Sequence, residues 1–186
     1  MIIPAAIILL YFSFVLELVI WPVPSEASTG HLLKEWKSNG TLRNVMYIFM
    51  YIINFFFTLS PLIISLYSLF HTDLIQSDLI SIGGLILAWS GRAISMYGAF
   101  LLHKNRRVNL LTGKIFRWSR NPISLGLFLT FLGLLMIIPY PLLIAAYVGF
   151  IVIINFKINI EEKFLNAKFG SEYQRYKKST PKYFIL

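Results

Sequence analysis

The chain has 186 residues, of which 57% are hydrophobic and only 13% are charged. Soluble domains carry about 45–50% apolar and about 25% charged residues, so this composition excludes an ordinary soluble domain and indicates a membrane protein. The absence of cysteine excludes disulfides, thiolate metal sites and a cysteine nucleophile. The net charge of +9 suits either a nucleic-acid-binding surface or a membrane protein whose Lys and Arg stay on the cytoplasmic side.

The N-terminal half contains three apolar stretches, each long enough for the roughly 20 residues that cross a bilayer. The first runs from Ile2 to Trp21 and lacks a preceding positive residue, so we expect a retained helix rather than a cleaved signal peptide. The second runs from about Val45 to Phe70, with a kink expected at Pro61. The third runs from Leu79 to about Leu102.

The C-terminal half contains a predicted helical hairpin. Its arms are Pro122–Ile138 and Leu142–Phe156, and Pro139-Tyr140-Pro141 separates them because proline cannot easily continue a helix. Beyond the hairpin, an apolar stripe predicts an amphipathic helix along the cytoplasmic surface, with a break at Gly170. The stripe consists of Phe164, Leu165, Phe169, Tyr173 and Tyr176.

The Lys and Arg residues of the connecting segments alternate in number. There are three between the first two helices, none before the third, six before the fourth, none in the proline turn and seven from Lys157 onward. This is the positive-inside pattern for an outside N-terminus and a cytoplasmic C-terminus, and a nucleic-acid surface has no reason to show it. We therefore predict an all-α, polytopic membrane protein with about five transmembrane helices, forming a single membrane domain over residues 1–186 with two N-terminal helices in residues 1–78.

The third predicted helix carries two further features. Its small residues predict the close approach of another helix; they are Gly84, Ala88, Gly91, Ser95 and Ala99. It also carries Arg92, which, like Glu17 in the first helix, is an ionisable residue inside an apolar stretch. Such residues are usually paired or face a cavity, so Glu17 and Arg92 are either a structural pair or interfacial residues, or they belong to a site.

Two polar segments flank the hairpin. In the first, Asn121 is a good helix N-cap and Pro122 suits the first helical turn, so the free backbone N–H groups there favour an anionic or carboxylate group. In the second, Lys157 and Glu161 are four residues apart and share one helix face. Taken alone, the first segment is an interfacial anchor or a site, and the second is a solvated ion pair or a site.

Together the two segments resemble a known family. Arg120-Asn-Pro-Ile-Ser-Leu-Gly is similar to the Arg-His/Asn-Pro-x-Tyr-x-Gly motif of the isoprenylcysteine carboxyl methyltransferase and phospholipid methyltransferase superfamily. The tail Glu161-Glu-x-x-Leu-x-x-x-Phe-Gly-x-x-Tyr-x-x-Tyr, followed by Pro181, is similar to that superfamily's C-terminal signature. A helical hairpin separates the two motifs there as here, and the resemblance covers roughly residues 101–186.

The resemblance implies a site for S-adenosylmethionine within a methyltransferase-like core at residues 79–186. It assigns Lys157 to the substrate carboxylate or headgroup and makes Arg120 a second catalytic residue. The implied cofactor-binding residues are Val108, Asn109, Leu110, Leu111, Phe116, Asn121, Pro122, Ile123, Ser124 and Glu161. No metal is expected, and the histidines fall in predicted loops without forming a metal cluster; they are His31, His71 and His103.

Three positions depart from the pattern of the resembling family. Ser124 replaces its usual Tyr, and Lys114 occupies its usual Gly position, with Gly113 one residue earlier. Lys157 replaces an Arg, which loses the bidentate fork for a carboxylate.

The functional hypothesis is an integral membrane methyltransferase that transfers a methyl group from S-adenosylmethionine to a lipophilic or prenylated acceptor from the bilayer, leaving S-adenosylhomocysteine. The closest activity is protein-S-isoprenylcysteine carboxyl O-methylation, and the alternative is N-methylation of a phospholipid amine. Methyl transfer from a sulfonium needs little acid–base work, because positioning and exclusion of water supply most of the catalysis. The rival from another class is a non-catalytic membrane scaffold or transporter subunit. The expected partners are membrane lipids, not nucleic acid.

Overall fold

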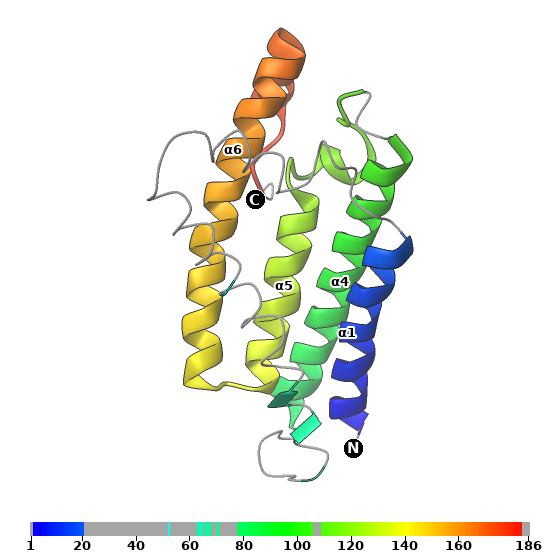
Figure 1. Ribbon diagram of the computed structural model, residues 1–186, viewed down its shortest axis with the longest axis vertical. Helices are drawn as coiled ribbons and strands as arrows, with labels where there is room; N and C mark the ends of the chain where they lie inside the picture. The colour runs from blue at the N-terminus through cyan, green and yellow to red at the C-terminus, as the bar shows by residue number, and fades with distance from the viewer. Residues whose placement is uncertain are drawn as a thin grey trace.

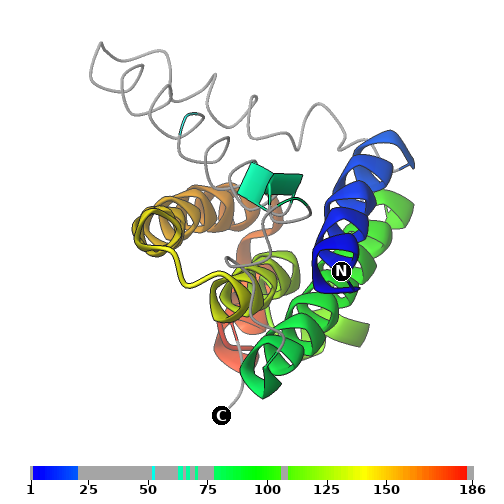
Figure 2. The ribbon, with the colours of Figure 1, turned by 90° about the horizontal axis from the view of Figure 1, so that it is seen from below.

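The computed structural model describes residues 2–20, 52, 63–64, 66–67, 70, 78–105 and 109–183. The long helices in these ranges are α1 (Ile2–Ile20), α4 (Leu79–Asn105), α5 (Pro122–Ile137) and α6 (Pro141–Ser179), and η3 (Lys114–Arg117) is a short 3-10 helix. They run side by side, with α1 against α4 and α5 between α4 and α6 (Figures 1 and 2). The described part contains no strand, which agrees with the predicted all-α fold.

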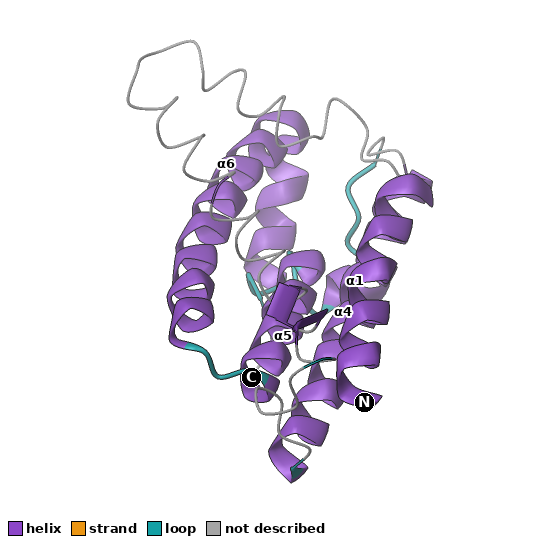
Figure 3. Cartoon of the chain, turned by 60° about the horizontal axis from the view of Figure 1, so that its bottom comes forward, coloured by secondary structure: helices purple, strands orange, loops and turns teal. Residues whose placement is uncertain are grey.

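Two of these helices, α4 and α6, are long and apolar enough to cross a membrane, and α1 and α5 contain shorter apolar runs. The predicted hairpin is confirmed as α5 and α6, which a short loop at residues 138–140 joins (Figure 3). The second predicted helix, Val45 to Phe70, lies almost entirely outside the described residues. Five transmembrane helices therefore stay a prediction.

The tightest contact of the described chain joins α4 to α5. A Cβ atom added to Gly91 would lie 2.5 Å from the carbonyl oxygen of Gly126, and one added to Gly126 would lie 2.5 Å from the carbonyl oxygen of Gly91. The two backbones therefore touch directly, because neither glycine has a side chain to hold them apart. The predicted row of small residues lies in this contact at Gly84, Ala88, Gly91 and Ser95, all of which are buried.

The predicted row of small residues in α4 was wrong at its last residue, Ala99. Ala99 is only half-buried, and Gly98 takes its place, where an added Cβ would lie 2.8 Å from the Ile123 side chain. The contact residues of α4 thus alternate in steps of four and three, because a straight four-residue row drifts around the helix. The matching residues of α5 were not predicted; they are Gly126, Thr130 and Gly133.

The pair between Glu17 and Arg92 is confirmed. Arg92 is 1% exposed, and its Nη1 donates to the Glu17 carboxylate and, at 2.9 Å, to Ser95 Oγ. Its Nε and Nη2 donate to the hydroxyl and the carbonyl oxygen of Ser13, each at 2.7 Å, and its guanidinium lies 3.9 Å from the Phe14 ring centroid. A charge inside an apolar bundle is tolerated when it is paired and hydrogen-bonded in this way, so Arg92 fastens α1 to α4.

Helix α6 continues without interruption from the predicted span to Phe169 and reverses at Gly170, which has φ 50° and ψ −121°. The pairs Glu162–Lys177 and Asn166–Gln174 lie symmetrically about Gly170, as two antiparallel arms require. The predicted break at Gly170 is confirmed. The predicted separate amphipathic helix along the surface is wrong, because its first half extends the span and its second half folds back on the first.

The contact between α4 and α5 predicts how single methyl groups change stability. Gly126→Ala places a Cβ against the Gly91 carbonyl oxygen, and overpacking of this kind costs about 1–3 kcal/mol. Gly83→Ala is the matched control, because its nearest neighbour is the end of the Met136 side chain at 3.9 Å. Thermal unfolding in detergent should show a lower Tm for Gly126→Ala and an unchanged or higher Tm for Gly83→Ala. Equal Tm values for the two variants would contradict the close packing.

Candidate functional site

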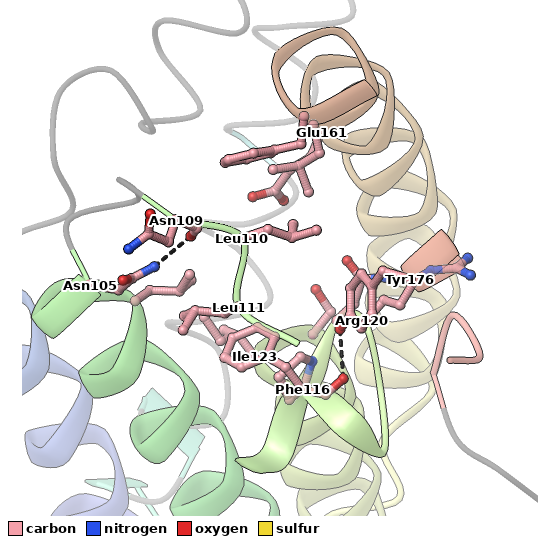
Figure 4. A pocket seen from close by; sticks show the side chains of 15 residues that line it. Asn105, Asn109, Leu110, Leu111, Phe116, Arg120, Ile123, Glu161 and Tyr176 are labelled. Carbon is pink, nitrogen blue, oxygen red and sulfur yellow. Dashed lines mark hydrogen bonds between the residues drawn. The ribbon is translucent and has the colours of Figure 1, made fainter. Parts of the chain in front are cut away.

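A pocket opens where the end of α4, the segment 109–124 and the part of α6 beyond Phe156 meet (Figure 4). It encloses about 670 Å³ not occupied by protein atoms, part of it open to solvent, which lies within the range of small-molecule sites. Its lining residues are Leu102, Asn105, Asn109, Leu110, Leu111, Phe116, Arg120, Asn121, Pro122, Ile123, Ser124, Glu161, Leu165, Phe169 and Tyr176.

The structure brings almost all of the predicted site residues to this pocket. Nine of the ten implied cofactor-binding residues line it, as does Arg120, and Val108 lies outside the described residues. Two further lining residues, Leu102 and Asn105, were not predicted; they lie one helical turn apart at the end of α4. Leu165, Phe169 and Tyr176 were predicted on a surface helix, whereas they line the pocket. Leu165 and Phe169 follow Glu161 by four and eight residues, so helical spacing could have predicted that both share its face of α6 and line the pocket.

Lys157 is not among the pocket-lining residues. It is half-buried and lies four residues before Glu161 in α6, on the same helix face and about 6 Å closer to the apolar part of the helix. Lys157 therefore lies between the pocket and the apolar part of the bundle.

Helix α5 begins at the pocket. Asn121 occupies the N-cap position and Pro122 the first turn, as predicted, but the Asn121 side chain makes no capping hydrogen bond. Its Nδ2 instead donates to the carbonyl oxygen of Lys182 at 3.0 Å. The first backbone N–H groups of a helix have no acceptor within the helix, and the Asn121 side chain supplies none to those of Ile123 and Ser124, two residues that line the pocket.

Arg120 lines the pocket, yet its guanidinium is held by acceptors from α6. Its Nε and Nη2 donate to Glu162 Oε1 at 3.2 and 2.9 Å, and its Nη1 donates to the carbonyl oxygens of Lys177 and Thr180 at 2.7 and 2.8 Å. Glu162 also accepts from Lys177 Nζ at 3.0 Å. Burial alone would raise the pKa of Glu162, but Lys177 and Arg120 outweigh burial and hold that pKa below its usual value. Glu162 was not among the predicted site residues.

Two aromatic residues that line the pocket, Phe116 and Tyr176, are joined by a hydrogen bond. Tyr176 Oη donates to the carbonyl oxygen of Phe116 at 2.6 Å, which joins the returning arm of α6 to η3 (Figure 4). Tyr173 is buried beside them in the same apolar cluster. Burial raises the pKa of Tyr176 and raises that of Tyr173 to about 12, so both phenols are protonated at neutral pH.

One departure from the family pattern lies in the turn before Phe116. Lys114 has φ 55°, in the left-handed region, whereas Gly113 has φ −98° and an extended conformation. A non-glycine residue pays roughly 1–2 kcal/mol in the left-handed region. The position that carries Gly in the resembling family is therefore the one that needs glycine's conformation here, and the chain adopts it with a lysine.

In the ranges that the structure describes, no group of three His, Cys, Asp or Glu side chains is placed to hold a metal ion. His103 lies in the last turn of α4 rather than in a loop, and it is exposed. His31 and His71 lie outside the described residues.

The family model described as phospholipid methyltransferase matches residues 76–172, just over half of the chain. The match begins just before α4 and ends just after the reversal at Gly170, so it contains every residue that lines the pocket except Tyr176. No curated protein and no solved structure matches significantly.

Proposed function

Because the chain belongs to the phospholipid methyltransferase family, whose members are membrane methyltransferases, we propose that its pocket binds S-adenosylmethionine and that it methylates a lipophilic acceptor. One observation carries the proposal. Residues from two motifs more than 35 positions apart, Asn121–Ser124 and Glu161, line the same pocket. A non-catalytic scaffold or transporter subunit has no need of this convergence.

The polar and apolar groups of the pocket fit the parts of S-adenosylmethionine. Glu161 suits the ribose diol or the ammonium group, since a carboxylate accepts hydrogen bonds from both. The uncapped N–H groups of Ile123 and Ser124 suit its carboxylate. The remaining walls suit the flat adenine ring; they include Leu110, Leu111, Leu165 and Phe169.

The chain's own residues act mainly by binding and orienting. When bound, S-adenosylmethionine supplies an electrophilic methyl group, and its sulfur takes the bonding pair to give neutral S-adenosylhomocysteine. The apolar walls exclude water from the reacting atoms, and fixed geometry then supplies most of the rate. We assign Arg120 a positioning role rather than the catalytic role first expected, because its guanidinium is occupied by Glu162 and by two backbone carbonyl oxygens.

We propose a carboxylate as the acceptor, as in isoprenylcysteine carboxyl O-methylation. A carboxylate attacks the methyl carbon without losing a proton, whereas an ammonium must first be deprotonated. Among the described residues that line the pocket, Glu161 is the one carboxylate and there is no histidine, so an amine would depend on Glu161 as its base. The family description favours the second candidate, a phospholipid amine.

Lys157 is the proposed contact to the acceptor. Its position one turn from Glu161, toward the apolar part of α6, suits an acceptor that enters from the bilayer with its charged end toward the pocket. We further propose that this end of the bundle is cytoplasmic and the N-terminus outside, because Lys and Arg collect in the segments at this end.

Cofactor binding tests the proposal. Isothermal titration of the purified protein with S-adenosylhomocysteine should show binding, and Glu161→Ala should weaken it about tenfold or more, as expected for a lost hydrogen bond to a charged group. Glu172→Ala is the matched control, because Glu172 is an exposed carboxylate of α6 that does not line the pocket. A wild-type protein that binds no S-adenosylhomocysteine would overturn the proposed activity and favour a scaffold or transporter subunit.

The acceptor is tested by the chemistry of the product. In membranes supplied with S-adenosylmethionine labelled in its methyl group, a carboxyl acceptor gives a methyl ester that releases labelled methanol in mild base. An N-methylated lipid keeps its label under the same treatment, and that outcome would replace the carboxylate by an amine. Lys157→Met should raise the KM for the acceptor without changing cofactor affinity. Lys163→Met is the control and should change neither quantity, because Lys163 is an exposed residue of the same helix that does not line the pocket.

A further inference from the structure

The side chain of Asn121 faces away from the helix that it begins. An asparagine at the N-cap normally accepts a hydrogen bond from a backbone N–H of the first turn. Asn121 makes no such bond, and its Nδ2 donates to the carbonyl oxygen of Lys182, 61 residues later. The Asn121 side chain therefore does not bond to the N–H groups of Ile123 and Ser124, and both residues line the pocket.

Residues 180–183, the C-terminal strap, hold Asn121 in this orientation. The backbone N–H of Arg120 donates to the carbonyl oxygen of Pro181 at 3.0 Å, and Ser119 Oγ donates to that of Lys182 at 3.3 Å. The strap thus binds three consecutive residues, Ser119, Arg120 and Asn121, and fixes the chain immediately before α5.

The strap is itself fastened to α6, on another side of the helix from the pocket. Lys182 Nζ donates to Asn155 Oδ1 at 3.2 Å and to Asn159 Oδ1 at 3.0 Å. The hydroxyl of Tyr183 also donates to Asn155 Oδ1, and its ring packs edge-on against Phe128 of α5. Lys182 therefore connects two helices: its side chain binds α6, and its carbonyl oxygen accepts from Asn121 at the start of α5.

We propose that Lys182 is a positioning residue of the cofactor site: by holding the Asn121 amide, it keeps the Ile123 and Ser124 N–H groups open to the carboxylate of the cofactor's methionine part. The inference rests on the proposed function and names a part of the cofactor that the strap controls. An unheld Asn121 would cap its own helix and compete with the carboxylate for the same donors. The positive end of the helix dipole strengthens the preference of these donors for an anion.

Two ligands separate this effect from a general loss of structure. S-adenosylhomocysteine carries the amino-acid carboxylate, whereas 5′-methylthioadenosine keeps the nucleoside and thioether but lacks it. Asn121→Asp cannot donate to the Lys182 carbonyl oxygen, caps its own helix well and repels a carboxylate. It should therefore weaken the binding of S-adenosylhomocysteine about tenfold or more while changing that of methylthioadenosine less than about twofold.

A second variant loosens the strap without touching the pocket. Lys182→Met removes the bonds to Asn155 and Asn159 and should also weaken S-adenosylhomocysteine selectively, and Lys182→Arg should restore binding because it again supplies charged donors. Lys178→Met, an exposed lysine nearby, should bind both ligands as the wild type does.

The outcomes distinguish the two proposals. Equal losses for both ligands in Asn121→Asp and Lys182→Met, or no loss for either, would overturn the role of the strap. If the wild type binds neither S-adenosylhomocysteine nor methylthioadenosine, the proposed function itself is overturned.

Discussion

Direct contact between the backbones of α4 and α5 sets the geometry of the described bundle. Gly91 and Gly126 each lie against the other's carbonyl oxygen, at distances that no Cβ atom tolerates. Because this contact fixes how the two helices align, the turn of α4 at Gly98 lies against the first turn of α5, and the last turn of α4 extends beyond it. Leu102 and Asn105 of α4 thereby face the same pocket as Ile123 and Ser124 of α5. The position of the pocket therefore depends on the glycines that let α4 and α5 pack closely.

The second wall of the pocket depends on the reversal of α6 at Gly170. The reversal returns Lys177 to Glu162, and Glu162 in turn holds Arg120 at the entrance of α5. These charged groups bond mainly to one another and to backbone carbonyl oxygens. Glu161, Ile123 and Ser124 line the pocket, where a ligand with both positive and negative groups has complementary partners.

Much of this arrangement follows from local sequence signals, and the rest depends on contacts between distant segments. Prolines predicted the hairpin and Gly170 predicted the break in α6, because proline and glycine change the conformations that the backbone can adopt at their own positions. Glu161 and Glu162 are adjacent in sequence but about 100° apart around α6, so only the packing of α6 decides which faces the pocket and which holds Arg120. The diverted side chain of Asn121 could not be predicted either, since its acceptor is a backbone carbonyl oxygen 61 residues away that any residue would supply.

The proposed function depends on the binding of the methyl donor by residues 109–124 and 161–176 together. Photolabelling with an azido-adenine analogue of S-adenosylmethionine, followed by mass spectrometry of the labelled peptides, tests it most directly. We expect labelled peptides from both segments and the loss of both labels when S-adenosylhomocysteine is added in excess. Label in α1 or at the loop between α5 and α6, or label that S-adenosylhomocysteine does not displace, would contradict it.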